Sequence, residues 1–193
     1  MRVIAGKARG FKLSSFKGIP IRPTLDRVKE SFFNQVNLVI EGARFLDLFA
    51  GTGNIGIEAL SRGAAKVVFV ESDRRARELI YKNLEKCHFL EGDDWELLKT
   101  DALRAVPFLD KGGYQFDLVY VDPPFKDEVY EPCLMKLSSS RLLTETALVV
   151  VESRHNAISN ENYGEISLTR RRRVGDSCLS FFSFNQPNPQ LKS

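Results

Sequence analysis

The chain has 193 residues, of which 43% are hydrophobic and 27% charged, and its net charge is +3. These values are typical of a soluble globular protein of one or two domains and argue against a disordered chain. The longest apolar run, residues 147–151, is far shorter than the roughly 20 residues that cross a bilayer, and residues 1–10 lack the apolar segment of a secretory signal. The three cysteines are widely spaced, which predicts free thiols in the cytoplasm and neither a disulfide framework nor a metal site.

Basic residues concentrate at the amino terminus. Residues 1–29 hold eight lysines and arginines against one acidic residue, and residues 170–173 are four consecutive arginines. A basic arm on a mildly acidic body predicts a surface that binds a polyanion, whereas the alternative is a solvated, poorly ordered terminus. Apolar residues alternate with basic ones at Phe11, Leu13 and Phe16, and this alternation favours a small hairpin or folded arm.

The remaining elements alternate between helix and strand along the chain. Hydrophobic periodicity predicts a helix over 25–39 that Thr24 can cap, and a helix over 74–86 that Asp73 can cap. Further helices are expected at 55–61, 102–109 and 128–137, and strands at 44–49, 66–71, 95–99, 116–121, 147–152, 164–173 and 178–184. This order predicts an α/β fold, a mostly parallel seven-stranded sheet with an antiparallel last strand. We expect a basic arm and helix over residues 1–40, the main domain over 41–184 and a disordered tail over 185–193.

A glycine-rich turn is the strongest local motif. It runs Phe45-Leu-Asp-Leu-Phe-Ala-Gly51-Thr-Gly53-Asn-Ile-Gly56, between a predicted buried strand and a helix. Glycines allow a tight turn and a close approach of the backbone to a ligand. Glu71 closes the next strand, where a carboxylate can accept hydrogen bonds from ribose hydroxyls. The pattern predicts a nucleoside cofactor rather than a merely structural turn, and it fits either a dinucleotide or S-adenosylmethionine.

A second motif, Val121-Asp122-Pro123-Pro124-Phe125, follows the predicted strand 116–121. In an open parallel sheet, ligands bind outside the carboxyl ends of the strands, so this motif and the glycine turn should face the same crevice. The two prolines remove N–H donors and leave acceptors, the Asp122 carboxylate and backbone carbonyls. Acceptors beside the flat ring of Phe125 suit an aromatic base that carries an exocyclic amino group.

With these motifs the sequence resembles S-adenosylmethionine-dependent methyltransferases that act on exocyclic amines of nucleic-acid bases. More closely, it is similar to the bacterial ribosomal RNA small subunit methyltransferase D family, which methylates guanine N2 in 16S rRNA. The similarity covers about residues 2–184 and includes Gly6-Lys-Ala-Arg9, Arg22-Pro-Thr24, Glu58-Ala-Leu-Ser-Arg62, Val70-Glu71-Ser-Asp73-Arg74, Asp122–Phe125 and Gly175-Asp176-Ser177.

The resemblance implies a Rossmann-like class I methyltransferase domain and a role for each matched residue. S-adenosylmethionine would bind to Asp47, Phe49, Gly51 and Gly53, with Glu71 on its ribose and Asp101 on its adenine amine, and S-adenosylhomocysteine would leave as product. Asp122 and the Pro123 carbonyl would hold the target amine while Phe125 stacks on the base. Substrate RNA would meet Arg22 and Thr24, which close the site, and Lys7 and Arg9 of the arm.

The chemistry needs no metal and no covalent intermediate. A guanine amine is a poor nucleophile because its lone pair is delocalised, and two acceptors on its hydrogens can free that pair for a direct displacement helped by positioning. The base must be flipped or unpaired to be reached. We expect a monomer that acts on small-subunit rRNA or its assembly particle, away from membranes. The alternatives are adenine N6 or another nucleic acid as substrate, an NAD-dependent dehydrogenase, and a non-catalytic RNA-binding protein.

Overall fold

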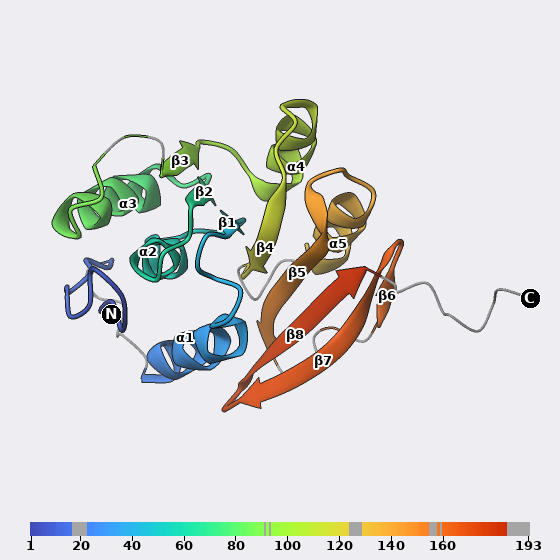
Figure 1. Ribbon diagram of the computed structural model, residues 1–193, viewed down its shortest axis with the longest axis horizontal. Coiled ribbons are helices and arrows are strands. Elements are labelled where there is room, and N and C mark those ends of the chain that lie inside the picture. The colour runs from blue at the N-terminus through green and yellow to red at the C-terminus, as the bar shows by residue number, and fades with distance from the viewer. Residues whose placement is uncertain are drawn as a thin grey trace, which may run out of the picture.

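The computed structural model describes residues 1–16, 23–90, 92, 94–123, 129–154, 158 and 160–184. Within these residues the chain forms one sheet of eight strands in the order β3-β2-β1-β4-β5-β8-β7-β6, with helices on both faces (Figure 1). The strands are β1 (Arg44–Asp47), β2 (Lys66–Val70), β3 (Trp95–Leu98), β4 (Phe116–Val121), β5 (Leu143–Arg154), β6 (Asn162–Tyr163), β7 (Ile166–Val174) and β8 (Ser177–Phe184). The helices are α1 (Pro23–Val36), α2 (Asn54–Ser61), α3 (Arg74–Lys86), α4 (Ala102–Lys111) and α5 (Tyr130–Ser138).

Strands β3, β2, β1, β4 and β5 pair in parallel, and β8, β7 and β6 continue the sheet in antiparallel pairing. The predicted Rossmann-like fold class is therefore confirmed. The described sheet has eight strands rather than seven, because the chain adds the two-residue strand β6, which is too short to give a periodic sequence pattern. Strand β5 also begins at Leu143, four residues before the predicted start.

Two hydrophobic cores lie on the two faces of the sheet. Successive strand side chains point to opposite faces, so Phe45 and Leu46 of β1 enter different cores although both are fully buried. The core that contains Phe45 also receives apolar residues of the arm, α1, α2 and α3, whereas the core of Leu46 is covered by α4 and α5. Figure 1 shows these two groups of helices on either side of the strands. Burial on both faces explains why the central strands are nearly continuous apolar runs.

The amino-terminal arm folds into the small hairpin predicted from its alternating pattern. Arg2 and Lys12 form an antiparallel bridge, and the Val3 amide donates to the Phe11 carbonyl at 3.0 Å. The arm lies against the end of α2, where the Lys7 amide donates to the Ser61 carbonyl at 2.8 Å. Gly6 has a positive φ of 81°, and a Cβ at this position would overlap the Ser61 carbonyl oxygen. The closest approach of arm and body therefore depends on a residue without a side chain.

The starts of helices α1 and α3 test the two predicted N-terminal caps. The Asp73 cap is confirmed, because its Oδ1 accepts a hydrogen bond from the Ala76 amide at 2.9 Å. The Thr24 cap is wrong, because α1 begins at Pro23 and so contains residue 24. Proline fits the first helical position, since its φ is already helical and its missing N–H would have had no helical partner. Residues 185–193 lie outside the described part of the chain, and among the described helices none has the length and apolar character of a bilayer span.

Candidate active site

Five carboxylates lie along one edge of the sheet, one for each parallel strand. Parallel strands end at the same edge, and the order of the strands sets the order of the acids across it: Asp101 after β3, Glu71 after β2, Asp47 at the end of β1, Asp122 after β4 and Glu152 near the end of β5. This edge is the place where open α/β sheets bind ligands. Four of the five acids are site residues predicted from the sequence.

A cavity of about 230 Å³ opens at the centre of this edge. Its wall combines the arm, α1, the glycine turn, the start of α2 and the strand ends. The lining residues are Met1, Ser15, Phe16, Lys29, Asp47, Phe49, Ala50, Gly51, Thr52, Asn54, Ile55, Tyr120, Asp122 and Glu152. The structure thus brings together four predicted site residues, Asp47, Phe49, Gly51 and Asp122. Four other predicted site residues do not line this cavity. Gly53 belongs to the glycine turn and Pro123 follows Asp122, while Glu71 and Asp101 lie on the same edge of the sheet.

The glycine turn is held by two of the carboxylates. Gly51 and Gly53 have positive φ values of 54° and 78°, which favour glycine at both positions. The Glu71 carboxylate accepts the Gly51 amide at 2.8 Å and the Asp73 amide at 2.7 Å. Asp47 accepts the amide of Gly56 in α2 at 3.0 Å. The two acids therefore shape the loop, whatever further bonds they make to a ligand.

Burial changes the protonation of the acids that line the cavity. It raises the pKa of Asp47 to about 7, against the opposing Gly56 hydrogen bond and with a smaller contribution from the charge of Glu71. Burial also raises the pKa of Asp122 well above its ordinary value, and the charges of Glu152 and Asp47 act in the same direction. A buried anion gains stability from a cation placed beside it. The cavity is thus suited to a cationic ligand.

Sequence reasoning missed Glu152. This residue is only 5% exposed, and its carboxylate accepts hydrogen bonds from the hydroxyls of Tyr120, at 2.6 Å, and Ser177, at 3.2 Å. A signal was present, because Glu152 ends the apolar run of a predicted buried strand, and a buried carboxylate needs partners.

Sequence reasoning also missed Lys29, which it counted only among the basic residues of positions 1–29. The side chain is fully buried, and its Nζ donates to the Arg2 carbonyl at 2.6 Å and to Asn54 Oδ1 at 2.9 Å, and lies 3.2 Å from Glu58 Oε2. Burial lowers the pKa of Lys29, although Glu58 acts in the opposite direction. Helical spacing could have revealed this position, because Lys29 shares a helix face with the apolar Phe33 and Val36.

Glu58 and its neighbours hold the arm in place. The Glu58 carboxylate accepts the amides of Ile4 at 2.8 Å and Ala5 at 3.0 Å, and the Arg62 Nε at 2.8 Å. Asn83 of α3, also fully buried, bonds to both Ser14 of the arm and the Thr52 carbonyl of the glycine turn. The arm is therefore part of the cavity wall rather than a separate appendage.

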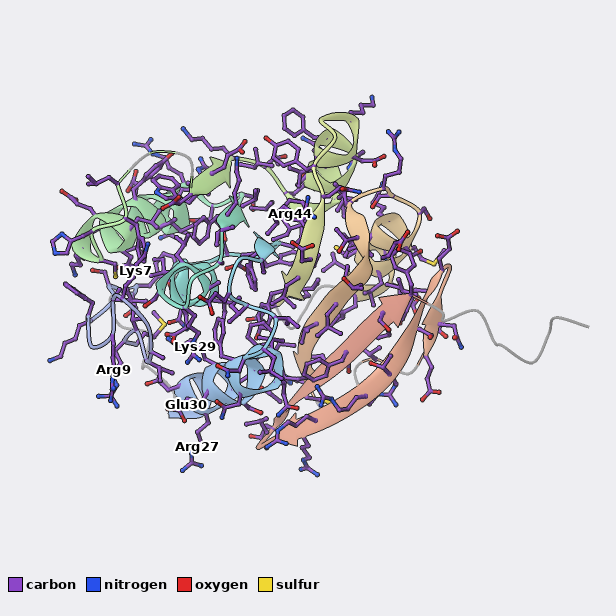
Figure 2. All side chains as sticks on the ribbon, in the orientation of Figure 1. Lys7, Arg9, Arg27, Lys29, Glu30 and Arg44 are labelled. Carbon is purple, nitrogen blue, oxygen red and sulfur yellow. The ribbon has the colours of Figure 1, made fainter. Side chains whose placement is uncertain are left out.

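The predicted RNA-binding residues Lys7 and Arg9 are exposed on the arm, outside the cavity. Lys7 Nζ lies over the Phe89 ring, 4.8 Å from its centre. Figure 2 shows Arg9 of the arm and Arg27 of α1 projecting outward on the same side of the molecule. The arginines of residues 170–173 are exposed on β7, where Arg172 Nε donates to the Ser31 hydroxyl of α1 at 2.9 Å.

The other predicted positions are placed only in part. Asp101 caps α4, since its Oδ1 accepts the Arg104 amide at 3.0 Å, and Pro123 is buried directly after Asp122. Arg22 and Phe125 lie outside the described residues, and so does the side chain of Thr24.

Comparison with known proteins identifies the family to which this chain belongs. A family model described as conserved hypothetical protein 95 matches residues 1–183. Ribosomal RNA small subunit methyltransferase D of Escherichia coli is 38% identical over 153 residues, which cover 79% of this chain and 74% of that protein. The chain belongs to this methyltransferase family. The resemblance identified from the sequence is therefore confirmed.

Two further relatives extend the match over nearly the whole chain. YlbH of Bacillus subtilis is 35% identical over 182 residues, which cover 94% of this chain and 98% of that protein. The solved structure of yhhF from Escherichia coli has 34% sequence identity and a TM-score of 0.82, and the alignment covers 97% of this chain and 99% of that one. These two relatives thus match this chain over nearly its whole length, and the solved structure shares its fold.

Proposed function

We propose that the protein transfers a methyl group from S-adenosylmethionine to the exocyclic N2 amine of a guanine in 16S ribosomal RNA. One observation carries this proposal: Asp122, the first residue of the Asp-Pro-Pro-Phe motif, lines the same cavity as Asp47, Phe49 and Gly51 of the glycine turn. A residue that can hold an amine and a loop that can hold a nucleoside cofactor therefore share one space.

The residues of the cavity fit this cofactor. S-adenosylmethionine carries a sulfonium and an ammonium group, and the cavity presents the carboxylates of Asp47, Asp122 and Glu152. When bound, the cofactor supplies a methyl group activated by the sulfonium. Asp47, Phe49, Gly51 and Gly53 would hold it, Glu71 would accept its ribose hydroxyls and Asp101 its adenine amine. The oxygens of Glu71 each accept one amide and keep a further lone pair for such a bond.

The target base would be held by acceptors at the end of β4. The Asp122 carboxylate and the Pro123 carbonyl would take the two hydrogens of the amine, and Phe125 would stack on the ring. These contacts orient the lone pair toward the methyl group, and orientation is the main contribution that a displacement of this kind requires. The base enters flipped or unpaired, because a stacked base cannot reach the end of β4.

The substrate RNA would approach from the side of the arm. Lys7 and Arg9 are exposed there, and Arg22 and Thr24 would close the site over the base. We infer that residues 1–40 serve mainly RNA binding and residues 41–184 mainly catalysis. The protein would act as a monomer in the cytoplasm, on small-subunit rRNA or its assembly particle.

Methylation of small-subunit rRNA from a strain that lacks this gene tests the proposal. The RNA, free or in particles, is incubated with the purified protein and S-adenosylmethionine, and the modified nucleoside is identified by mass spectrometry. We expect N2-methylguanosine. N6-methyladenosine would redirect the proposal to the other exocyclic amine, and no methylated nucleoside would contradict it. Calorimetric titration with NAD, which we expect not to bind, tests the dehydrogenase alternative.

A further inference from the structure

A second carboxylate, that of Glu152, lies beside Asp122 and has no assigned step in the methyl transfer proposed above. Val121 of β4 pairs in parallel with Val151 of β5, so the residues that follow them, Asp122 and Glu152, reach the edge of the sheet side by side. Both line the central cavity. Neighbouring carboxylates in a buried setting influence each other's protonation, because each anion disfavours the other.

The surroundings of the two acids differ. Glu152 is buried, and each of its oxygens accepts a hydroxyl hydrogen, from Tyr120 on one side and Ser177 on the other. Hydrogen bonds to a carboxylate favour its ionised form. Asp122 is half-buried, and within the described part of the chain no hydrogen bond ends on its carboxylate. Glu152 is therefore the anion of the pair that hydrogen bonds hold in place, and Asp122 is the more exposed member.

We propose that Glu152 is a positioning residue whose fixed negative charge keeps Asp122 basic, so that Asp122 takes the proton that the target amine loses. This inference rests on the proposed function. The amine nitrogen forms a bond to the methyl carbon with its lone pair, and the carbon–sulfur bond breaks with its electrons left on the sulfur. The nitrogen then gives its extra proton to the Asp122 carboxylate, which passes it to water.

The protonation of the pair agrees with this assignment. Burial raises the pKa of both acids, but the two hydroxyl donors oppose the shift at Glu152, whereas the charge of Glu152 adds to it at Asp122. Other ionisable groups lie near the pair: Asp47 of β1, Tyr120 of β4 and Tyr130 of α5 interact with its charges. Lys29 of α1 lines the same cavity, and Arg154 of β5 acts on Tyr130. All of them remain in a variant that changes Glu152 alone, so such a variant isolates its charge.

The substitution Glu152→Gln removes the charge and keeps the size of the side chain. Loss of the neighbouring anion lowers the pKa of Asp122, so the part of the rate profile that rises with pH moves to lower pH. A less basic acceptor also slows the reaction, and we expect kcat to fall by about tenfold or more, since positioned proton transfer commonly contributes 10²–10⁴-fold. The KM for RNA should change far less. Glu145→Gln, an exposed glutamate on the same strand, is the matched control and should behave as wild type.

A measurement without cofactor or RNA gives a second readout. Carbon-13 NMR of the side-chain carboxyl groups follows the titration of Asp122, whose signal is identified by its absence in Asp122→Asn. The wild-type signal should titrate well above about 4, the value of an unperturbed aspartate, and at lower pH in Glu152→Gln. A wild-type Asp122 that titrates near 4 overturns the proposal even if the variant does not fold, and circular dichroism reports whether it does.

The outcomes separate this inference from the proposed function. A wild-type protein that methylates no RNA overturns the proposed function and the role of Glu152 with it. An active wild type whose pH profile and Asp122 titration are unchanged in Glu152→Gln overturns only the role of Glu152. Glu152→Asp, which retains the charge, should keep the Asp122 titration near its wild-type pH while Glu152→Gln lowers it, whereas a purely structural role for Glu152 predicts no such difference between the two variants.

Discussion

The carboxyl edge of the sheet and the amino-terminal arm both border the cavity, but they carry opposite charges in opposite settings. At the edge, Asp47 and Glu152 are buried carboxyl groups that the strands hold in place. On the arm, Lys7 and Arg9 are exposed cations, while the backbone beneath them is bound by buried polar side chains of the body, among them Glu58. Buried charges respond to pH and to a ligand in contact with them, whereas exposed charges respond to salt and attract a polyanion at a distance. Substitutions in the two regions should therefore impair different properties of the protein.

The largest effect is expected where the arm is joined to the body. Glu58→Ala leaves the fully buried Lys29 without its counter-ion and the Ile4 and Ala5 amides without their acceptor. Breaking a buried pair in this way costs about 3–5 kcal/mol, and urea unfolding measures the loss. Glu78→Ala is the control, because its pair with Arg74 has the same helical spacing as the Glu58–Arg62 pair but is exposed, and it should cost less than about 1 kcal/mol. Equal losses would mean that the buried network does not hold the arm.

The next largest effect is expected at the edge. Asp122→Asn should reduce methyl transfer by about 10²–10³-fold, the loss typical of removing one preorganised polar group from an active centre. Affinity for S-adenosylmethionine should hardly change, because Asp122 serves the amine more than the cofactor. Single-turnover kinetics and calorimetry separate the two quantities. Wild-type turnover in this variant would show that the amine is held elsewhere.

A smaller loss, confined to cofactor binding, is expected at Glu71. Glu71→Ala should weaken the binding of S-adenosylmethionine by about 1.5–3 kcal/mol, the range for hydrogen bonds to a charged acceptor. The variant lacks the carboxylate that would bind the ribose and that fixes the Gly51 amide. Calorimetric titration measures the loss. Glu96→Ala, near the amino-terminal end of strand β3 and so away from the carboxyl edge, should bind as wild type, and an unchanged affinity in Glu71→Ala would contradict the ribose role.

The smallest effect is expected on the arm, and salt should reveal it. Replacing Lys7, Arg9 and Lys12 with alanine should lower RNA affinity and flatten its salt dependence, by about 0.7–0.9 units of log–log slope for each phosphate that the arm no longer neutralises. Filter binding at several salt concentrations measures both, while affinity for the cofactor stays the same. Replacing Lys111, Lys136 and Arg141 removes the same charge from the side of α4 and α5 and should change little. If the two triple variants behaved alike, only net charge would matter.

The alternating helices and strands were predictable because each central strand is an apolar run bounded by turn residues, and only β6 was too short to leave a pattern. The glycine turn and Asp122 were predictable because they lie at strand ends, where topology alone places them at one edge. Glu152 and Lys29 were missed because their roles depend on distant partners. The Tyr120 hydroxyl lies 32 residues from Glu152, and the Arg2 carbonyl lies 27 residues from Lys29. A local sequence pattern does not show which distant residues form a hydrogen bond. A charged residue within a predicted apolar face therefore indicates a functional position, but it does not identify the residues that bind it.

Gly6 shows how far the requirements of the site extend from the cavity. It touches neither cofactor nor RNA in the proposed function, yet any side chain there would meet the Ser61 carbonyl in a backbone conformation that favours glycine. Displacing the arm at this point would remove Met1 and Phe16 from the cavity wall. In a library of random variants selected for activity, position 6 should tolerate as few replacements as Asp122, while the neighbouring Lys7 should vary widely. Intolerance to substitution at position 6 would then indicate a contact between two segments of the chain rather than a contact with a ligand.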